Sequence, residues 1–247
     1  MSQVRAQKLG EQVVRILGAY IVGGKYSENQ SLPSEQEISQ EFGVSRTVSR
    51  DVTRTLESLG VISVTQGRRV TLRPRTEWDY MNPLLLEFHS PEDVRRILGD
   101  LHDVRLLLEP EIAARAAKQI AAERLASMEA TIRAMKQSER DPDRYLEHDL
   151  TFHMELVWAC ENVVLGRIVQ SSRGLLATSR QVTQLIPGGL SIATSGHEKI
   201  LEAVAAGNPD EARRTMREHL EFASKVWLED KIPIEFGFSG DGESRSS

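Results

Sequence analysis

Residues 32–72 read LPSEQEISQEFGVSRTVSRDVTRTLESLGVISVTQGRRVTL, and this stretch decides the fold of the N-terminal part of the chain. Ser34 precedes a polar run in which Glu37 stands three residues on, which is the pattern of a helix N-cap with a capping-box acid. Gly43 interrupts the short helix that follows, and Ser45 is placed to cap the next one. Two short helices joined by a turn that contains glycine predict a helix-turn-helix.

The helix expected over residues 46–59 carries a basic stripe, because Arg46, Arg50 and Arg54 are four residues apart and share one face. The hydroxyl side chains expected beside this stripe are those of Thr47, Ser49 and Thr53. Arginine pairs bidentately with guanine edges and hydroxyls bond phosphates, so this composition suits a helix in the major groove. A solvated helix face is the alternative interpretation.

The residues after this helix favour DNA recognition. Residues 61–64 alternate like a strand, residues 66–69 form a basic turn, and residues 70–72 pair back to complete a hairpin. A basic hairpin directly after a recognition helix is a wing, and it can place Arg68 or Arg69 at the minor groove or the phosphate backbone.

The motifs of this segment resemble those of the GntR family of bacterial regulators over about residues 7–72. The motifs are Leu32-Pro33-Ser34-Glu35, Phe42-Gly43-Val44-Ser45-Arg46, Arg50, Leu56, Leu59-Gly60 and the Gly67 wing. With this resemblance, the expected DNA-contacting residues are Ser45, Arg46, Thr47, Arg50, Gln66, Gly67 and Arg68. Many family members carry arginine directly after the Pro-Ser-Glu string, whereas this chain has Gln36, so a base contact at that place is weakened or altered.

Charge and composition divide the 247 residues into a basic head and an acidic body. Residues 1–75 hold 11 Lys and Arg against 7 Asp and Glu, and the remainder holds 20 against 29, so only the head is expected to meet phosphate. The single cysteine, Cys160, excludes an internal disulfide and is expected to be an inert core thiol. No apolar run suits a membrane span and no secretion signal is evident, so the predicted location is the cytoplasm.

The C-terminal part shows helical periodicity throughout, with helices expected over about 91–119, 122–137, 141–160, 163–185, 193–206 and 208–228. The predicted fold is therefore mainly α, with a winged helix-turn-helix followed by an antiparallel bundle of about six helices. The predicted divisions are a DNA-binding domain over 1–75, a linker over 76–92, an effector-binding domain over 93–230 and a disordered tail over 231–247. Apolar residues from Trp78 to Phe88 are expected to pack the head against the body or against a partner chain.

A metal site is suggested by one carboxylate and three imidazoles. Asp149 and His153 are four residues apart on one helix face, and His197 and His219 lie on two further helices. Such a set suits zinc first, with manganese, nickel or iron as alternatives. By spacing alone, an ordinary hydrogen-bonded or solvated Asp–His pair is the more common outcome.

The C-terminal motifs also resemble a known domain, the FCD effector domain of the FadR subfamily, over about residues 93–228. The motifs are Asp149-Leu150-Thr151-Phe152-His153, Arg105-Leu106-Leu107-Leu108-Glu109-Pro110, His197-Glu198-Lys199-Ile200 and His219-Leu220. The resemblance implies that Asp149, His153, His197 and His219 are the metal ligands, a set that the fatty-acyl-binding branch lacks.

Two arginines are candidates for the effector, since a planar guanidinium binds carboxylate bidentately. Arg105 is the first choice, with a salt bridge to Glu109 as the alternative, and Arg180 is the second. The segment from Trp78 to Phe88 resembles the linker of sugar-acid-responsive family members, such as galactonate-operon repressors.

These patterns together predict a homodimeric transcriptional repressor that a small carboxylate, a sugar acid, releases from operator DNA by binding at the metal site. A metal-dependent enzyme that uses the Asp/His set is the alternative function, and a purely structural metal is a third possibility. The sequence shows no separate base or nucleophile motif, and an enzyme has no need of residues 7–72, so we expect no catalytic residues.

Overall fold

The computed structural model describes residues 2–27, 31–65, 69–183 and 188–228, and it divides into two compact units, Met1–Ser90 and Pro91–Ser247. Among the described residues, no helix is long and apolar enough to cross a membrane. The predicted fold class is confirmed, because the described residues form helices with a single two-stranded sheet.

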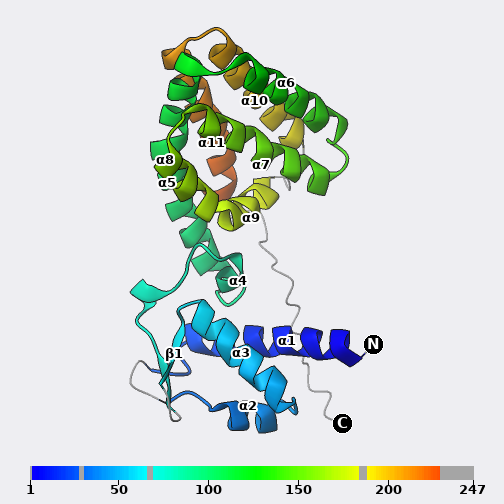
Figure 1. Ribbon diagram of the computed structural model, residues 1–247, viewed down its shortest axis with the longest axis vertical. Coiled ribbons are helices and arrows are strands. Elements are labelled where there is room, and N and C mark those ends of the chain that lie inside the picture. The colour runs from blue at the N-terminus through cyan, green and yellow to red at the C-terminus, as the bar shows by residue number, and fades with distance from the viewer. Residues whose placement is uncertain (1, 28–30, 66–68, 184–187, 229–247) are drawn as a thin grey trace. The chain divides into compact units, whose positions relative to one another are not determined.

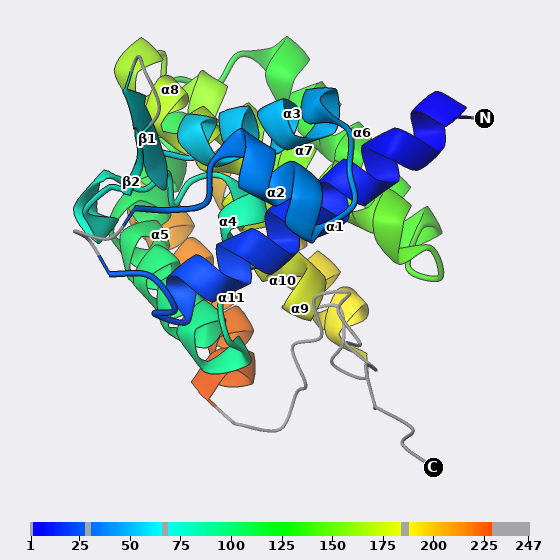
Figure 2. The same cartoon turned by 90° about the horizontal axis from the view of Figure 1, so that it is seen from below.

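The first unit is a winged helix-turn-helix built on α1 (Ser2–Val22), α2 (Glu35–Glu41) and α3 (Arg46–Ser58), as Figures 1 and 2 show. Ser34 and Glu37 form the predicted capping box, in which the Glu37 carboxylate accepts from the Ser34 backbone N–H at 2.8 Å. Ser45 caps α3 by accepting from the Val48 N–H. Gly43, between the helices, has φ +61°, a conformation that glycine adopts without steric cost.

The wing is an antiparallel pair of strands, β1 (Ile62–Thr65) and β2 (Arg69–Leu72), in a register from Ile62 opposite Leu72 to Thr65 opposite Arg69. Gly60 (φ +69°) makes the turn from α3 into β1, where a Cβ atom would lie 2.4 Å from the Glu77 carbonyl oxygen. The predicted wing-tip contacts Gln66, Gly67 and Arg68 lie outside the described residues.

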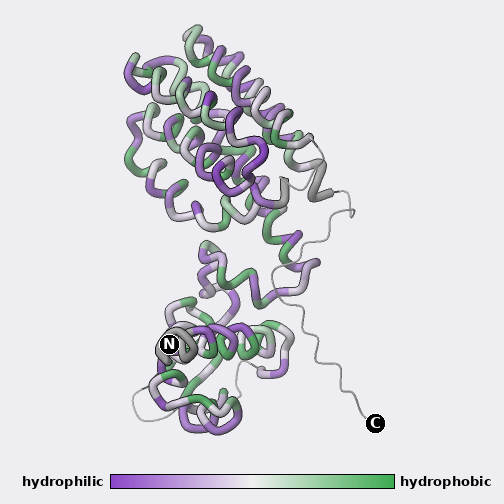
Figure 3. The backbone as a smooth tube through the Cα atoms, turned by 90° about the vertical axis from the view of Figure 1, so that its right-hand side faces the viewer, coloured by the Kyte–Doolittle hydropathy of each residue, from purple (hydrophilic) through white to green (hydrophobic). Residues whose placement is uncertain are grey.

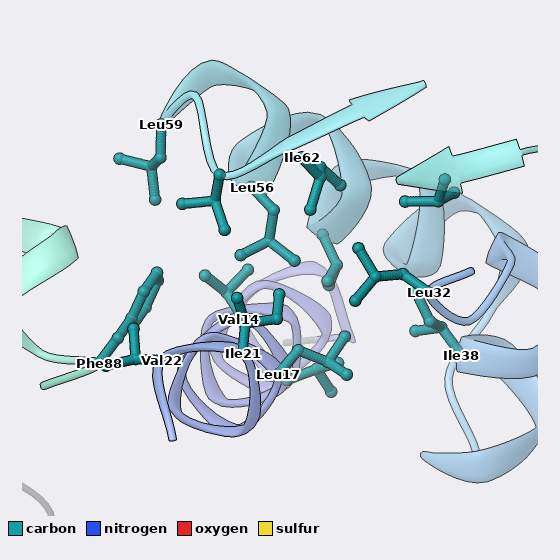
Figure 4. Close-up of a cluster of buried hydrophobic side chains, with 14 of the residues drawn as sticks. Val14, Leu17, Ile21, Val22, Leu32, Ile38, Leu56, Leu59, Ile62 and Phe88 are labelled. Carbon is teal, nitrogen blue, oxygen red and sulfur yellow. The ribbon is translucent and has the colours of Figure 1, made fainter. Parts of the chain in front are cut away.

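The apolar core of this unit joins α1, α2, α3 and β1, and Figure 4 shows Leu17, Ile38 and Leu56 directed into one cluster. The segment predicted as a linker belongs to the same core. It contains a short 3-10 helix (Arg75–Glu77) and α4 (Pro83–Leu86), and its Trp78, Leu85 and Phe88 are buried. The Phe88 ring packs where a Cβ atom on Gly18 would clash, at 2.4 Å. These apolar residues therefore serve the N-terminal unit itself.

All the secondary-structure elements described in the second unit are helices. Its helices are α5 (Pro91–Gln119), α6 (Ala122–Gln137), α7 (Pro142–Ala159), α8 (Val163–Ser171), α9 (Arg173–Thr183), α10 (Gly189–Ala205) and α11 (Pro209–Leu228). The helix expected over 163–185 is two helices, because α8 ends at its C-cap Ser172 and α9 begins at once.

Helix α5 packs along α11, α7 packs against α5 and α6, and α10 packs on α11, α6 and α5. Apolar and polar residues alternate along these helices in Figure 3, and their apolar faces meet around fully buried side chains such as Phe152, Leu156, Ile200 and Met216. Cys160 is buried as predicted, and burial raises the pKa of its thiol to about 11.

Candidate metal and effector site, and candidate DNA interface

The recognition helix α3 presents part of the predicted DNA-binding surface. Arg46, Thr47 and Arg50 are exposed, as is the N-cap residue Ser45. The expected exposure of Ser49 and Thr53 is wrong, because they are 0% and 3% exposed and their hydroxyls donate to the carbonyls of residues 46 and 49. The exposed face of α3 is therefore narrower and more cationic than the sequence pattern indicated.

The four candidate metal ligands come from three helices of the second unit and are buried together. Asp149 and His153 lie on α7, His197 on α10 and His219 on α11, with 0–9% of each residue exposed. One ligand nitrogen from each of the three histidines lies within 4.8 Å of the other two. The fold thus brings together residues that are up to 70 positions apart in the sequence.

His197 is the centre of this group. Its Nε2 atom lies 3.2 Å from the Nε2 atom of His153 and 3.2 Å from a carboxylate oxygen of Asp149. Two atoms that each lie about 2.0–2.1 Å from one cation are separated by about 3 Å, so these distances fit ligands of a shared ion. The His219 ring lies beside that of His197, tilted by 51°, with 4.3 Å between centroids.

Two nitrogen atoms of the cluster need a partner that the described residues do not supply. The Nδ1 atoms of His197 and His219 are buried and have no hydrogen-bond partner there. Gly196 makes room for the second ring, since a Cβ atom on this residue would lie 2.6 Å from His219 Nδ1. Buried polar atoms without partners are rare in folded proteins, and imidazole nitrogens gathered within 4.8 Å of one another beside a carboxylate are a ligand set that suits a cation.

A second layer of buried charges surrounds the histidines. Arg180 of α9 pairs with Asp149, and Arg105 of α5 donates from Nε to Glu109 at 2.6 Å. The other carboxylate oxygen of Glu109 lies 2.8 Å from His153 Nδ1. The sequence indicated Glu109 only as a possible salt-bridge partner of Arg105, because an (i, i+4) spacing does not show that both residues are buried.

Burial and neighbouring charges shift the pKa values of several of these buried groups. Burial, with Arg180 close by, lowers the pKa of His153 to about 4, and burial holds that of His219 well below its usual value. Burial alone would raise the pKa of Glu109, but Arg105 and His153 outweigh it and hold that pKa well below its usual range. Arg180 and His197 likewise hold the pKa of Asp149 low. His153 and His219 are therefore neutral and available as ligands at neutral pH.

A small cavity of about 30 Å³ adjoins the cluster and is lined by Arg105, Tyr145, Asp149, Arg180 and His219, among others. Both terminal nitrogens of Arg180 are buried without a hydrogen-bond partner among the described residues. Tyr145 was not predicted, and its hydroxyl shares a hydrogen bond of 3.0 Å with Thr194. Both predicted effector arginines thus border one small cavity beside the predicted metal ligands.

Comparison with known families assigns both halves of the chain. The model of the bacterial regulatory proteins of the gntR family matches residues 9–72, and that of the FCD domain matches residues 100–222. The galactonate operon transcriptional repressor of Escherichia coli K12 is 31% identical over 159 residues, which cover 64% of this chain and 69% of the relative.

Other relatives match over most of their length. The transcriptional regulator LutR of Bacillus subtilis is 28% identical over 81% of this chain and 92% of its own. The putative L-lactate dehydrogenase operon regulatory protein of E. coli K12 is 27% identical over 89% and 86%. A solved structure of Lar, which controls expression of the Listeria monocytogenes agr system, has the same fold, with a TM-score of 0.58, 20% identity, and coverage of 88% of this chain and 96% of Lar.

Proposed function

This chain belongs to the GntR family of bacterial regulatory proteins and carries an FCD domain, and from that premise we propose that it is a repressor whose release from DNA is controlled by a small carboxylate bound beside a metal ion. The family assignment makes the protein a DNA-binding transcriptional regulator and not an enzyme, so the metal-dependent enzyme that the Asp/His set also suggested is set aside.

The observation that carries the proposal is the buried convergence of Asp149, His153, His197 and His219 beside the unpartnered end of Arg180. Imidazole and carboxylate ligands suit zinc first, with manganese, nickel or iron as alternatives. A bound cation would supply positive charge, and coordination positions open to the oxygen atoms of a ligand.

The charges around the site favour an anionic effector. The positive charges of Arg105 and Arg180 balance the negative charges of Glu109 and Asp149, and the lowered pKa values of His153 and His219 keep these two rings neutral at neutral pH. A divalent cation therefore adds two uncompensated positive charges to a buried centre, where charge is costly unless it is paired. An effector carboxylate bound by the guanidinium groups of Arg180 and Arg105 would offset part of the cost of burying this charge. The cation and the effector are therefore expected to bind cooperatively.

The names of the relatives narrow the class of effector. One represses a galactonate operon and another is a putative regulator of an L-lactate dehydrogenase operon. Galactonate and lactate both carry a hydroxyl group next to a carboxylate, and these two groups together can approach a cation and an arginine. We therefore propose an α-hydroxy carboxylate as the effector, with sugar acids as the first candidates.

The DNA-binding surface that we propose consists of α3 and the wing. Arg46, Thr47 and Arg50 would contact bases and phosphates, with Ser45 at the start of the helix, and the wing residues Gln66, Gly67 and Arg68 would reach the minor groove or the backbone. One such helix reads only a few base pairs, so we propose a homodimer on a pseudo-palindromic operator. Sedimentation of the free and DNA-bound protein tests this, and a monomer in both states would contradict it.

The metal site is tested by elemental analysis of purified protein reloaded with divalent ions, followed by thermal-shift assays with galactonate, lactate and propionate. We expect one metal per chain in the wild type and none in His153→Ala. Stabilisation by the hydroxy acids should require the metal and should exceed that by propionate, because a ligand of the folded state raises stability by mass action. A protein that binds no stoichiometric metal, or binds it independently of His153, would refute the site. Metal that depends on His153 without any response to carboxylates would make it purely structural.

A further inference from the structure

Glu109 is a buried carboxylate that the family motifs do not assign to the metal or to the effector. It is 6% exposed and lies on α5, the helix that begins at Pro91, directly after the last residue of the DNA-binding unit. Burial of a charged side chain at such a place is costly, and an apolar residue of similar size would be cheaper for folding alone. The contacts of this carboxylate indicate what it contributes.

Each oxygen of Glu109 serves a different residue of the site. One oxygen accepts from Arg105 Nε at 2.6 Å, and the other lies 2.8 Å from His153 Nδ1. The opposite nitrogen of that ring, Nε2, faces His197 at 3.2 Å. Glu109 therefore lies between a candidate effector arginine, from which it accepts a hydrogen bond, and a candidate metal ligand, whose ring nitrogen lies 2.8 Å from its second oxygen.

The contact with Glu109 determines which nitrogen of the His153 ring carries the proton. A carboxylate that accepts from Arg105 Nε at 2.6 Å is an acceptor, so the ring nitrogen that faces its other oxygen at 2.8 Å is the one that carries the proton. When the proton of a neutral imidazole is on Nδ1, the Nε2 atom has a free lone pair. In His153, Nε2 is the atom that faces the other candidate ligands. Carboxylates that orient metal-binding histidines in this manner are a recurring feature of metal sites.

We propose that Glu109 is the positioning residue of the site: it holds His153 with Nε2 directed at the cation and ties Arg105 to the same carboxylate, so that metal and effector act on one helix. This inference rests on the metal site of the proposed function. Because Arg105 and Glu109 are both on α5, a change in either contact acts on the helix that continues directly from the DNA-binding unit.

The test compares the Zn²⁺ affinity of the full-length wild type with that of Glu109→Gln and Glu111→Gln, by competition with a chromophoric chelator. Glu111 is a matched control, since it lies on the same helix but is exposed and pairs only with Arg115 and Arg213 among the described residues. We expect Glu109→Gln to lower the affinity by about 10- to 100-fold, and Glu111→Gln to leave it unchanged. Equal affinity in Glu109→Gln and the wild type would overturn the proposal.

A second measurement does not depend on how well the variant folds. In metal-free wild type labelled with ¹⁵N-histidine, long-range ¹⁵N–¹H spectra report the tautomer of each ring, and His153 should carry its proton on Nδ1. A ring protonated on Nε2 would overturn the role of Glu109 even if zinc binds. A wild type that binds none of zinc, manganese, nickel and iron would instead refute the metal site of the proposed function, and the tautomer would still decide the orienting role.

Discussion

Replacement of Arg180 by methionine tests the electrostatics of the site in a single step. The Arg180–Asp149 pair is buried, with 8% of each side chain exposed. Removal of one member of such a pair leaves an uncompensated charge and typically costs about 3–5 kcal/mol. In a chain of this size, about 1 kcal/mol corresponds to about 2–4 °C in Tm, so the metal-free variant should melt about 6–20 °C below the wild type.

Zinc should then reduce the difference in Tm between Arg180→Met and the wild type. Arg180 attracts Asp149 but repels an incoming cation, so its loss removes a competitor for the carboxylate. Zinc at 100 times its Kd stabilises the wild type by about 2.7 kcal/mol, and the increment in Arg180→Met should be larger. The effector, in contrast, should lose one of its two arginine partners and should stabilise the loaded variant less than the loaded wild type.

Differential scanning calorimetry with and without Zn²⁺ provides the assay. Arg173→Met is the matched control, because Arg173 is exposed on the same helix and its loss should shift Tm only slightly. A drop of less than 2 °C in metal-free Arg180→Met, or an equal zinc increment in variant and wild type, would refute this description of the site.

Three further predictions concern DNA binding, packing and pH. Arg46→Ala and Arg50→Ala should each weaken operator binding by about 1–3 kcal/mol, measured by fluorescence anisotropy, and should leave the circular dichroism spectrum unchanged. Operator binding at wild-type strength would show that these residues are not in the interface. Gly196→Ala should displace the His219 ring, since the new Cβ would lie 2.6 Å from Nδ1, and should weaken zinc binding in the chelator assay, whereas unaltered zinc binding would show that the ring is not a ligand. Metal-free protein should lose stability as pH falls from about 6.5 to 4, because the folded state holds the His153 pKa near 4 and the unfolded chain takes up the proton first. In urea titrations, His153→Gln should reduce the slope of unfolding free energy against pH over this range. An equally steep slope would contradict the low pKa of His153.

The local signals in the sequence were sufficient for the helix-turn-helix. The Ser34–Glu37 capping box, Gly43 and the Ser45 cap are short-range features, and each is formed by residues within four positions of one another. Exposure was less predictable. Ser49 and Thr53 appeared to belong to the DNA-binding face, but their hydroxyls bond to carbonyls of their own helix, which allows them to be buried.

The four candidate ligands could be selected from the sequence, but the contacts of the charged residues around them could not be predicted. Asp149 and His153 share a helix face by their spacing, while the positions of His197 and His219 beside them followed from the family motif. Glu109 could not be recognised in this way, because an Arg105–Glu109 pair looks the same on an exposed helix as on a buried one. The break between α8 and α9 could not be predicted either, because the residues at this break, Ser171 and Ser172, are not the proline or glycine that commonly marks a helix end.

Control of DNA affinity by an effector at the metal site is tested most directly by one titration. Operator DNA chosen by in vitro selection is titrated with zinc-loaded wild type and with His153→Ala, each with and without the hydroxy acid that gives the largest thermal shift. The wild type should bind DNA at least tenfold more weakly with the acid, which requires about 1.4 kcal/mol of coupling, and His153→Ala should bind equally well in both conditions. An acid that weakens DNA binding equally in both proteins, or in neither, would contradict the claim.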